Sequence, residues 1–132
     1  MKKKDLNILF IGNSHTYYND MPLMVKRRAD EEGYNCRVTM LAHPNWFLSQ
    51  HADEPDVRFN ILYGKYDYVV LQEHAHPFGP EESFLNAAIP LNKMIREAGF
   101  DNAGIDLICG WPDERNGAVS DAWRRTLESA EI

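Results

Sequence analysis

The chain has 132 residues, a formal net charge of -6 and 44% hydrophobic residues. Its length and apolar fraction predict one domain, residues 1–132, that buries a single core without disulfides. The acidic balance and the lack of a Lys/Arg stripe argue against a nucleic-acid partner. No apolar run is long enough to span a bilayer, and Cys36 and Cys109 match no metal or redox spacing. We therefore expect a cytoplasmic protein with reduced cysteines and no membrane partner.

In chain order, four short apolar runs alternate with stretches of helical spacing. The runs are rich in β-branched residues and predict strands over residues 8–11, 38–42, 68–71 and 105–109. Helices are expected from near Met21 to Gly33, over 57–62, over 80–98 with Pro90 as a kink, and from Ser120 onwards. Strands that alternate with helices predict an α/β domain with a parallel sheet covered on both faces.

Polar and reactive side chains follow the predicted strands. In an open parallel sheet the carboxyl ends of the strands form one edge, and ligands bind there. The five histidines all lie on or just after the first three of these loops: His15, His43, His51, His74 and His76. Gly12-Asn13-Ser14 is also an ordinary turn sequence, so a purely structural role for it stays open.

The turn after the first strand favours nucleophilic catalysis over phosphate binding. Neither GxGxxG nor GxxxxGK[ST] is present, and the bulky Tyr17 and Tyr18 follow the turn. Ser14 instead comes directly after a strand and before a helix, where backbone N–H groups can stabilise a developing oxyanion.

Three segments carry a family resemblance. LFIGNSHTYYNDMP resembles the first motif of the SGNH (GDSL-like) hydrolases, in a Gly-Asn-Ser variant. WFLSQH followed by YDYVVLQEHAHPF is similar to the second and third motifs, and ICGWPDERNG to the fourth strand. The resemblance implies a flavodoxin-like three-layer α/β/α sandwich with strand order 2-1-3-4. It also implies a serine esterase or acetylesterase of small or carbohydrate esters, without cofactor or metal.

The resemblance also implies roles for individual residues. Ser14 takes the place of the nucleophile, and its own N–H contributes to the oxyanion hole. A second donor, a glycine in the family, falls on Pro44 or Asn45, and of these only Asn45 has an N–H to give. A third falls on Gln72, whose side-chain NH2 can donate to the oxyanion or can instead bind loop backbone.

The general base departs from the family pattern. The family uses a histidine in a late Asp-x-x-His motif, whereas the last histidine here is His76, and Asp121-Ala-Trp-Arg124 ends on a residue that accepts no proton. We expect a shortened member that lacks the fifth strand and is impaired as a hydrolase. Its substitute base is one of His15, His74 and His76, and His74 is favoured. The fourth strand would then form an open sheet edge, which predicts a homo-oligomer.

A non-catalytic protein is the rival interpretation. It would use the same edge to bind a small molecule, or a metal through two or three of the five histidines. His74 and His76 are alternate residues, which point to opposite sides in extended backbone, so joint ligation by this pair is disfavoured.

Overall fold

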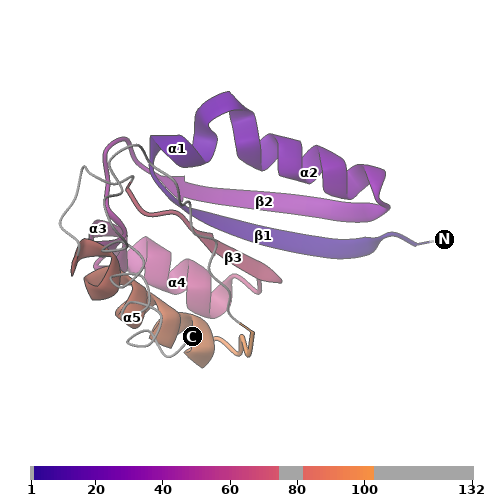
Figure 1. Ribbon diagram of the computed structural model, residues 1–132. Coiled ribbons are helices and arrows are strands. Elements are labelled where there is room, and N and C mark those ends of the chain that lie inside the picture. The colour runs from indigo at the N-terminus through magenta and orange to yellow at the C-terminus, as the bar shows by residue number, and fades with distance from the viewer. Residues whose placement is uncertain (1, 75–81, 103–132) are drawn as a thin grey trace, which may run out of the picture.

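A parallel sheet with helices on both faces organises the computed structural model, which describes residues 2–74 and 82–102 (Figure 1). The strands are β1 (Lys4–Gly12), β2 (Tyr34–Ala42) and β3 (Tyr68–Leu71). They lie in the order β2-β1-β3, and β1 pairs in parallel with both neighbours. The predicted α/β class is therefore confirmed. The strand predicted over 105–109 and the helix predicted from Ser120 lie outside the described residues, so the 2-1-3-4 order stays a prediction.

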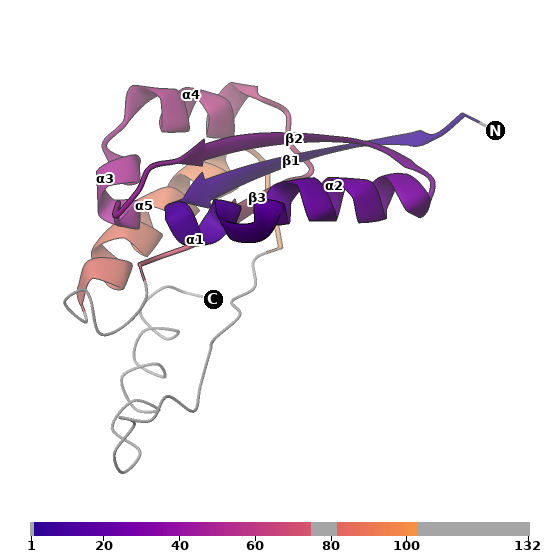
Figure 2. The same cartoon turned by 90° about the horizontal axis from the view of Figure 1, so that it is seen from above.

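The helices form a layer on each side of this sheet (Figures 1 and 2). One layer holds α1 (Ser14–Tyr17), the 3-10 turn η1 (Tyr18–Asp20) and α2 (Met21–Glu31). The other holds α3 (Leu48–Ala52), α4 (Pro55–Tyr63) and α5 (Glu82–Glu97). The sequence predicted α2, α4 and α5 to within a few residues, but it missed α1 and α3, because helices of four and five residues are too short to show a helical period.

Glycines end two of these helices as predicted. Gly33 and Gly99 follow α2 and α5 with φ of +93° and +99°, a conformation that costs a residue without Cβ very little. Pro22 lies in the first turn of α2, where the missing N–H breaks no helical hydrogen bond.

The centre of the core is β1, whose alternate side chains face the two helix layers. Leu9 and Ile11 are fully buried against α3, α4 and α5, whereas Ile8 and Phe10 pack beneath α2. A strand covered on both faces needs apolar residues at every position, and this explains the uninterrupted run Ile8 to Ile11.

The second strand begins earlier than the sequence predicted. Tyr34 to Arg37 pair with Lys4 to Asn7, the polar first half of β1, so this part of the ladder carries no apolar run to reveal it. Cys36 is the exception, being 2% exposed, and it is a free thiol. Its predicted lack of a bond to Cys109 stays a prediction, because Cys109 lies outside the described residues.

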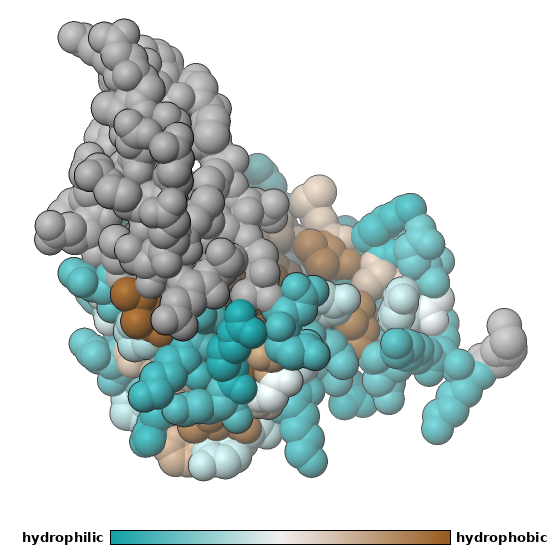
Figure 3. Space-filling model, turned by 60° about the horizontal axis from the view of Figure 1, so that its bottom comes forward, coloured by the Kyte–Doolittle hydropathy of each residue, from teal (hydrophilic) through white to brown (hydrophobic). Residues whose placement is uncertain are grey.

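The described surface is mixed in polarity. From the side that lies at the bottom of Figure 1, hydrophobic residues form separate patches among hydrophilic ones (Figure 3). Within residues 2–74 and 82–102, no helix has the length and apolar character needed to cross a membrane.

Candidate active site

The carboxyl edge of the sheet is defined here as the loops that follow β1, β2 and β3. Asn13 connects these three loops through its backbone and its side chain. Its backbone N–H donates to Gln72 Oε1, 3.0 Å away, and its Nδ2 donates to the carbonyl oxygen of Trp46, also at 3.0 Å. Its Oδ1 caps α1 by accepting the N–H of His15 at 3.0 Å. Asn13 is 1% exposed and all of its side-chain polar atoms are paired. The three loops therefore meet, as a parallel sheet requires.

Ser14 is the first residue of α1 and lies directly after this buried asparagine. The first N–H groups of a helix have no acceptor within the helix, so the Ser14 N–H is chemically suited to bind an anionic oxygen. Ser14 is half-buried, between the buried Asn13 and the exposed His15. The turn thus presents a hydroxyl group on a well-anchored backbone.

Close contact between the first and third loops explains Gly12. A Cβ atom at this position would lie 2.2 Å from Thr16 Oγ1 and 2.7 Å from Gln72 Oε1. The Thr16 hydroxyl donates to the same Gln72 oxygen at 2.9 Å. Glycine is therefore required by space, because no other residue lets Thr16 and Gln72 meet over the strand end.

The side-chain amide of Gln72 is used within the protein. Its Oε1 accepts from Asn13 and Thr16, and its NH2 group donates to the carbonyl oxygen of Glu73. In this conformation Gln72 makes the loop contacts that the sequence left as an alternative to oxyanion binding.

Asn45 occupies a position that suits glycine. The N–H of Trp46 donates to the His43 carbonyl at 3.3 Å, closing a tight turn in which Pro44 is the second residue and Asn45 the third. Asn45 has φ +62°, the left-handed conformation that a type II turn needs at this place. Asparagine tolerates this conformation better than other residues with a Cβ.

His51 is a structural residue of this edge. Its Nε2 lies 2.7 Å from the Gly12 carbonyl oxygen, and because a carbonyl accepts, this nitrogen carries the proton. The ring is 1% exposed and packs against Trp46 and His43, with centroid distances of 5.0 and 5.8 Å. Burial lowers the pKa of His51, so the neutral ring is favoured. The Nε2 of His51 is therefore committed to the Gly12 carbonyl at the end of β1, and the place of His51 among the ligands of the rival metal-binding interpretation stays a prediction.

His74 and His15 approach each other across the edge. Their ring centroids are 6.3 Å apart in an edge-on arrangement, and the His74 ring also stacks on Phe47 at 4.7 Å. His15 follows Ser14 directly, so the His74 ring lies near the start of α1. His76 lies outside the described residues. Within those residues, no group of three or more His, Cys, Asp or Glu side chains is placed to hold a metal ion.

Glu73 is a half-buried glutamate that sequence reasoning missed. Its Oε1 accepts the N–H groups of Leu48 at 3.2 Å and His74 at 2.6 Å. Its Oε2 is buried and has no hydrogen-bond partner within the described part of the chain. Desolvation raises the pKa of Glu73, against the effect of these two hydrogen bonds and of His74.

Asn13 and Thr16 were also missed as functional residues. A spacing signal existed for Asn13, because an asparagine before a helix is a common cap. The partners of the other residues come from distant parts of the chain, which no local pattern reveals.

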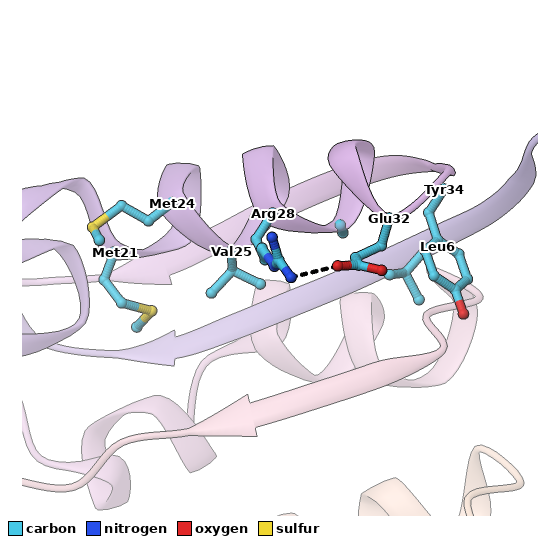
Figure 4. A pocket seen from close by; sticks show the side chains of 8 residues that line it. Leu6, Met21, Met24, Val25, Arg28, Glu32 and Tyr34 are labelled. Atoms are coloured by element: carbon cyan, nitrogen blue, oxygen red, sulfur yellow. Dashed lines mark ion pairs between the residues drawn. The ribbon is translucent and has the colours of Figure 1, made fainter.

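A hollow of the described surface lies away from this edge. It measures about 650 Å³ and lies between α2 and the first residues of β1 and β2, with Leu6, Met21, Met24 and Tyr34 among its lining (Figure 4). An ion pair between Arg28 and Glu32 closes one side. Its lining contains no serine, histidine or cysteine.

Comparison of the chain with family models, curated proteins and solved structures finds no match.

Proposed function

We propose that this chain is an SGNH-type serine ester hydrolase domain that acts on small esters, with Ser14 as the nucleophile. The observation that supports this most directly is the anchoring of the Ser14 turn. Asn13 ties it to the loops after β2 and β3, the two loops that supply the other proposed groups. Preorganised donors around a nucleophile are the usual source of catalysis in acyl transfer.

The proposed reaction follows serine hydrolase chemistry. The Ser14 oxygen attacks the ester carbonyl carbon while its proton passes to a base, and the carbonyl oxygen becomes an oxyanion. The N–H groups of Ser14 and Asn45 and the NH2 of Gln72 are the proposed donors to that oxyanion. The alcohol leaves with the proton from the base, and water then hydrolyses the acyl-enzyme to release the acid and free Ser14.

Two features make the proposed reaction slow. Gln72 donates to the Glu73 carbonyl, so its NH2 has to leave that acceptor before it can bind an oxyanion. Loss of one oxyanion donor commonly lowers kcat by about 100- to 1000-fold. The proposed base is His74, whose ring lies near the start of α1, and it needs to come within about 3 Å of the Ser14 oxygen in the substrate complex.

An activated acetyl ester tests this function. We expect slow turnover that Ser14→Ala abolishes and that His74→Ala lowers more than His15→Ala does. A fluorophosphonate should add one covalent group to the wild type and none to Ser14→Ala, as measured by intact mass. Ser49→Ala, a half-buried serine on α3, is the matched control and should keep both signals.

Absence of both the adduct and Ser14-dependent turnover would contradict the hydrolase and favour the binding interpretation.

A homo-oligomer is the second part of the proposal. On β3, Tyr68 and Val70 point to the α2 side of the sheet and are 61% and 39% exposed. Exposed apolar side chains beside a strand favour association with another chain. Light scattering at increasing concentration should show a mass above that of one chain, and a stable monomer would contradict this part.

A further inference from the structure

We propose that Glu73 is a positioning residue. Its Oε1 links the loop after β3 to the start of α3 and thereby holds the stacked rings of His74 and Phe47, called the wall here, beside α1. Its consequence for catalysis rests on the proposed hydrolase function, whereas the contact itself does not.

The contact joins two backbone segments through one oxygen atom. Oε1 accepts from the N–H of Leu48, 25 residues earlier in the chain, and from the N–H of His74, the next residue. Leu48 is 1% exposed and belongs to the core that contains Leu9 and Ile11. The loop after β3 is therefore tied to a rigid part of the molecule.

The rings of Phe47 and His74 lie next to these N–H groups and face each other. Phe47 precedes Leu48 in the chain, and its ring stacks on that of His74 with centroids 4.7 Å apart and planes inclined by 22°. The N–H of Phe47 donates to Gln50 Oε1 at 2.9 Å, which fixes this end of the wall to α3. The other end reaches His15, beside Ser14, at 6.3 Å. Release of Oε1 would therefore detach the His74 side of the ring pair, while the Gln50 contact keeps the Phe47 side in place.

The charge of Glu73 is not what makes this contact. Oε2 is buried without a partner among the described residues, so ionisation leaves an unpaired anionic oxygen inside the protein. The titratable neighbour that influences the pKa of Glu73 is His74, and the ring of His15 in α1 lies beside the His74 ring. From α3, Glu73 receives the backbone N–H of Leu48. Since a neutral amide oxygen can also accept both N–H groups, Glu73→Gln should preserve the wall and Glu73→Ala should lose it.

Hydrogen exchange of two backbone amides tests the contact without any enzyme assay. In Glu73→Ala the Leu48 and His74 amides should exchange about tenfold faster or more, because each loses its acceptor. In Glu73→Gln both should stay within about threefold of the wild type. Glu31→Gln on α2, where the side chain is 67% exposed, is the control for loss of one carboxylate and should leave both amides unchanged.

The same variants test positioning through Ser14 chemistry. With the activated acetyl ester, Glu73→Ala should lower kcat/KM about tenfold, and Glu73→Gln should restore it to within about threefold. The wild-type pH profile should bend where Glu73 ionises, and that bend should be absent from Glu73→Gln. If Glu73→Ala does not fold, Glu73→Asp replaces it, because its carboxyl group is one methylene too short to reach both N–H groups.

Three results separate the possible failures. Unchanged exchange at Leu48 and His74 in the Ala or Asp variant overturns the contact. Faster exchange with unchanged kcat/KM overturns the positioning role. Faster exchange in a protein whose wild type shows no Ser14-dependent turnover supports the contact and contradicts the proposed hydrolase function instead.

Discussion

The loops that follow β1 and β3, called the β1 exit and the β3 exit here, lie side by side at the carboxyl edge. They differ in how many of their polar groups have hydrogen-bond partners. At the β1 exit, every polar atom of the Asn13 side chain has a partner, and the Gly12 carbonyl accepts from His51. At the β3 exit, Glu73 keeps one buried oxygen that has no partner within the described residues. A fully paired network rigidifies its surroundings, whereas an unpaired buried carboxyl makes the local structure sensitive to pH. We infer that the β1 exit is the fixed half of the edge and the β3 exit the adjustable half.

The largest effect should come from removing the ring that supports the β1 exit. His51→Ala removes one of the two donors to the Gly12 carbonyl, which keeps only the His43 N–H, and opens a cavity beside Trp46, so the free energy of unfolding should fall by about 3 kcal/mol. Urea unfolding measures this loss. His51→Gln, whose amide can still donate, should recover part of it, and equal losses in the two variants would show that the hydrogen bond contributes little.

A smaller loss is expected when the gap between the two exits is filled. Gly12→Ala places a methyl group against Thr16 and Gln72, which should cost about 2 kcal/mol of unfolding free energy and displace the Gln72 amide. Gly33→Ala is the control, because a Cβ there meets nothing within 4 Å and the cost is the strain of its positive φ alone, about 1 kcal/mol. A Gly12→Ala protein as stable as Gly33→Ala would mean that the exits are not tightly packed.

The two exits should respond to pH in opposite directions. The pKa of His51 is lowered in the folded state from 6.5, so its contribution to stability is present above that value and declines as the pH falls towards the lowered pKa. The pKa of Glu73 is raised from 4.5, so its contribution is present below 4.5 and declines as the pH rises towards the raised pKa.

Unfolding measured against pH in single variants separates these contributions. His51→Gln should remove the loss on the acid side, and Glu73→Gln should remove the loss that sets in above pH 4.5. If the slope of unfolding free energy against pH is the same in both variants as in the wild type, the distinction between a fixed β1 exit and an adjustable β3 exit is wrong.

The smallest effect concerns the turn after β2, which contacts the β1 exit through Trp46. Asn45→Gly should change the free energy of unfolding by no more than about 0.5 kcal/mol, because glycine adopts a positive φ readily. Asn45→Val should lose about 1 to 2 kcal/mol, since a β-branched residue is strained there. Ester turnover should be kept in Asn45→Gly, which retains the N–H group, and loss of turnover would give the asparagine side chain a role of its own.

The sequence by itself determined the layers and the edge where the loops meet. Apolar runs such as Ile8 to Ile11 identify strands, helical spacing identifies α2 and α5, and glycines at 33 and 99 mark where those helices end. These signals are local, since they depend on period and on backbone conformation. Parallel topology then places the strand exits together without reference to any particular contact.

The partners of the polar groups were decided by the tertiary structure alone. Asn13 meets Trp46 and Gln72, His51 meets the Gly12 carbonyl, and Glu73 meets Leu48. Each contact joins residues 25 or more positions apart, with Asn13 and Gln72 separated by 59. The sequence shows that a histidine or a glutamate is present, but burial and the nearest acceptor decide what it does. For this reason His51 resembles a ligand in the sequence and supports a strand end in the fold.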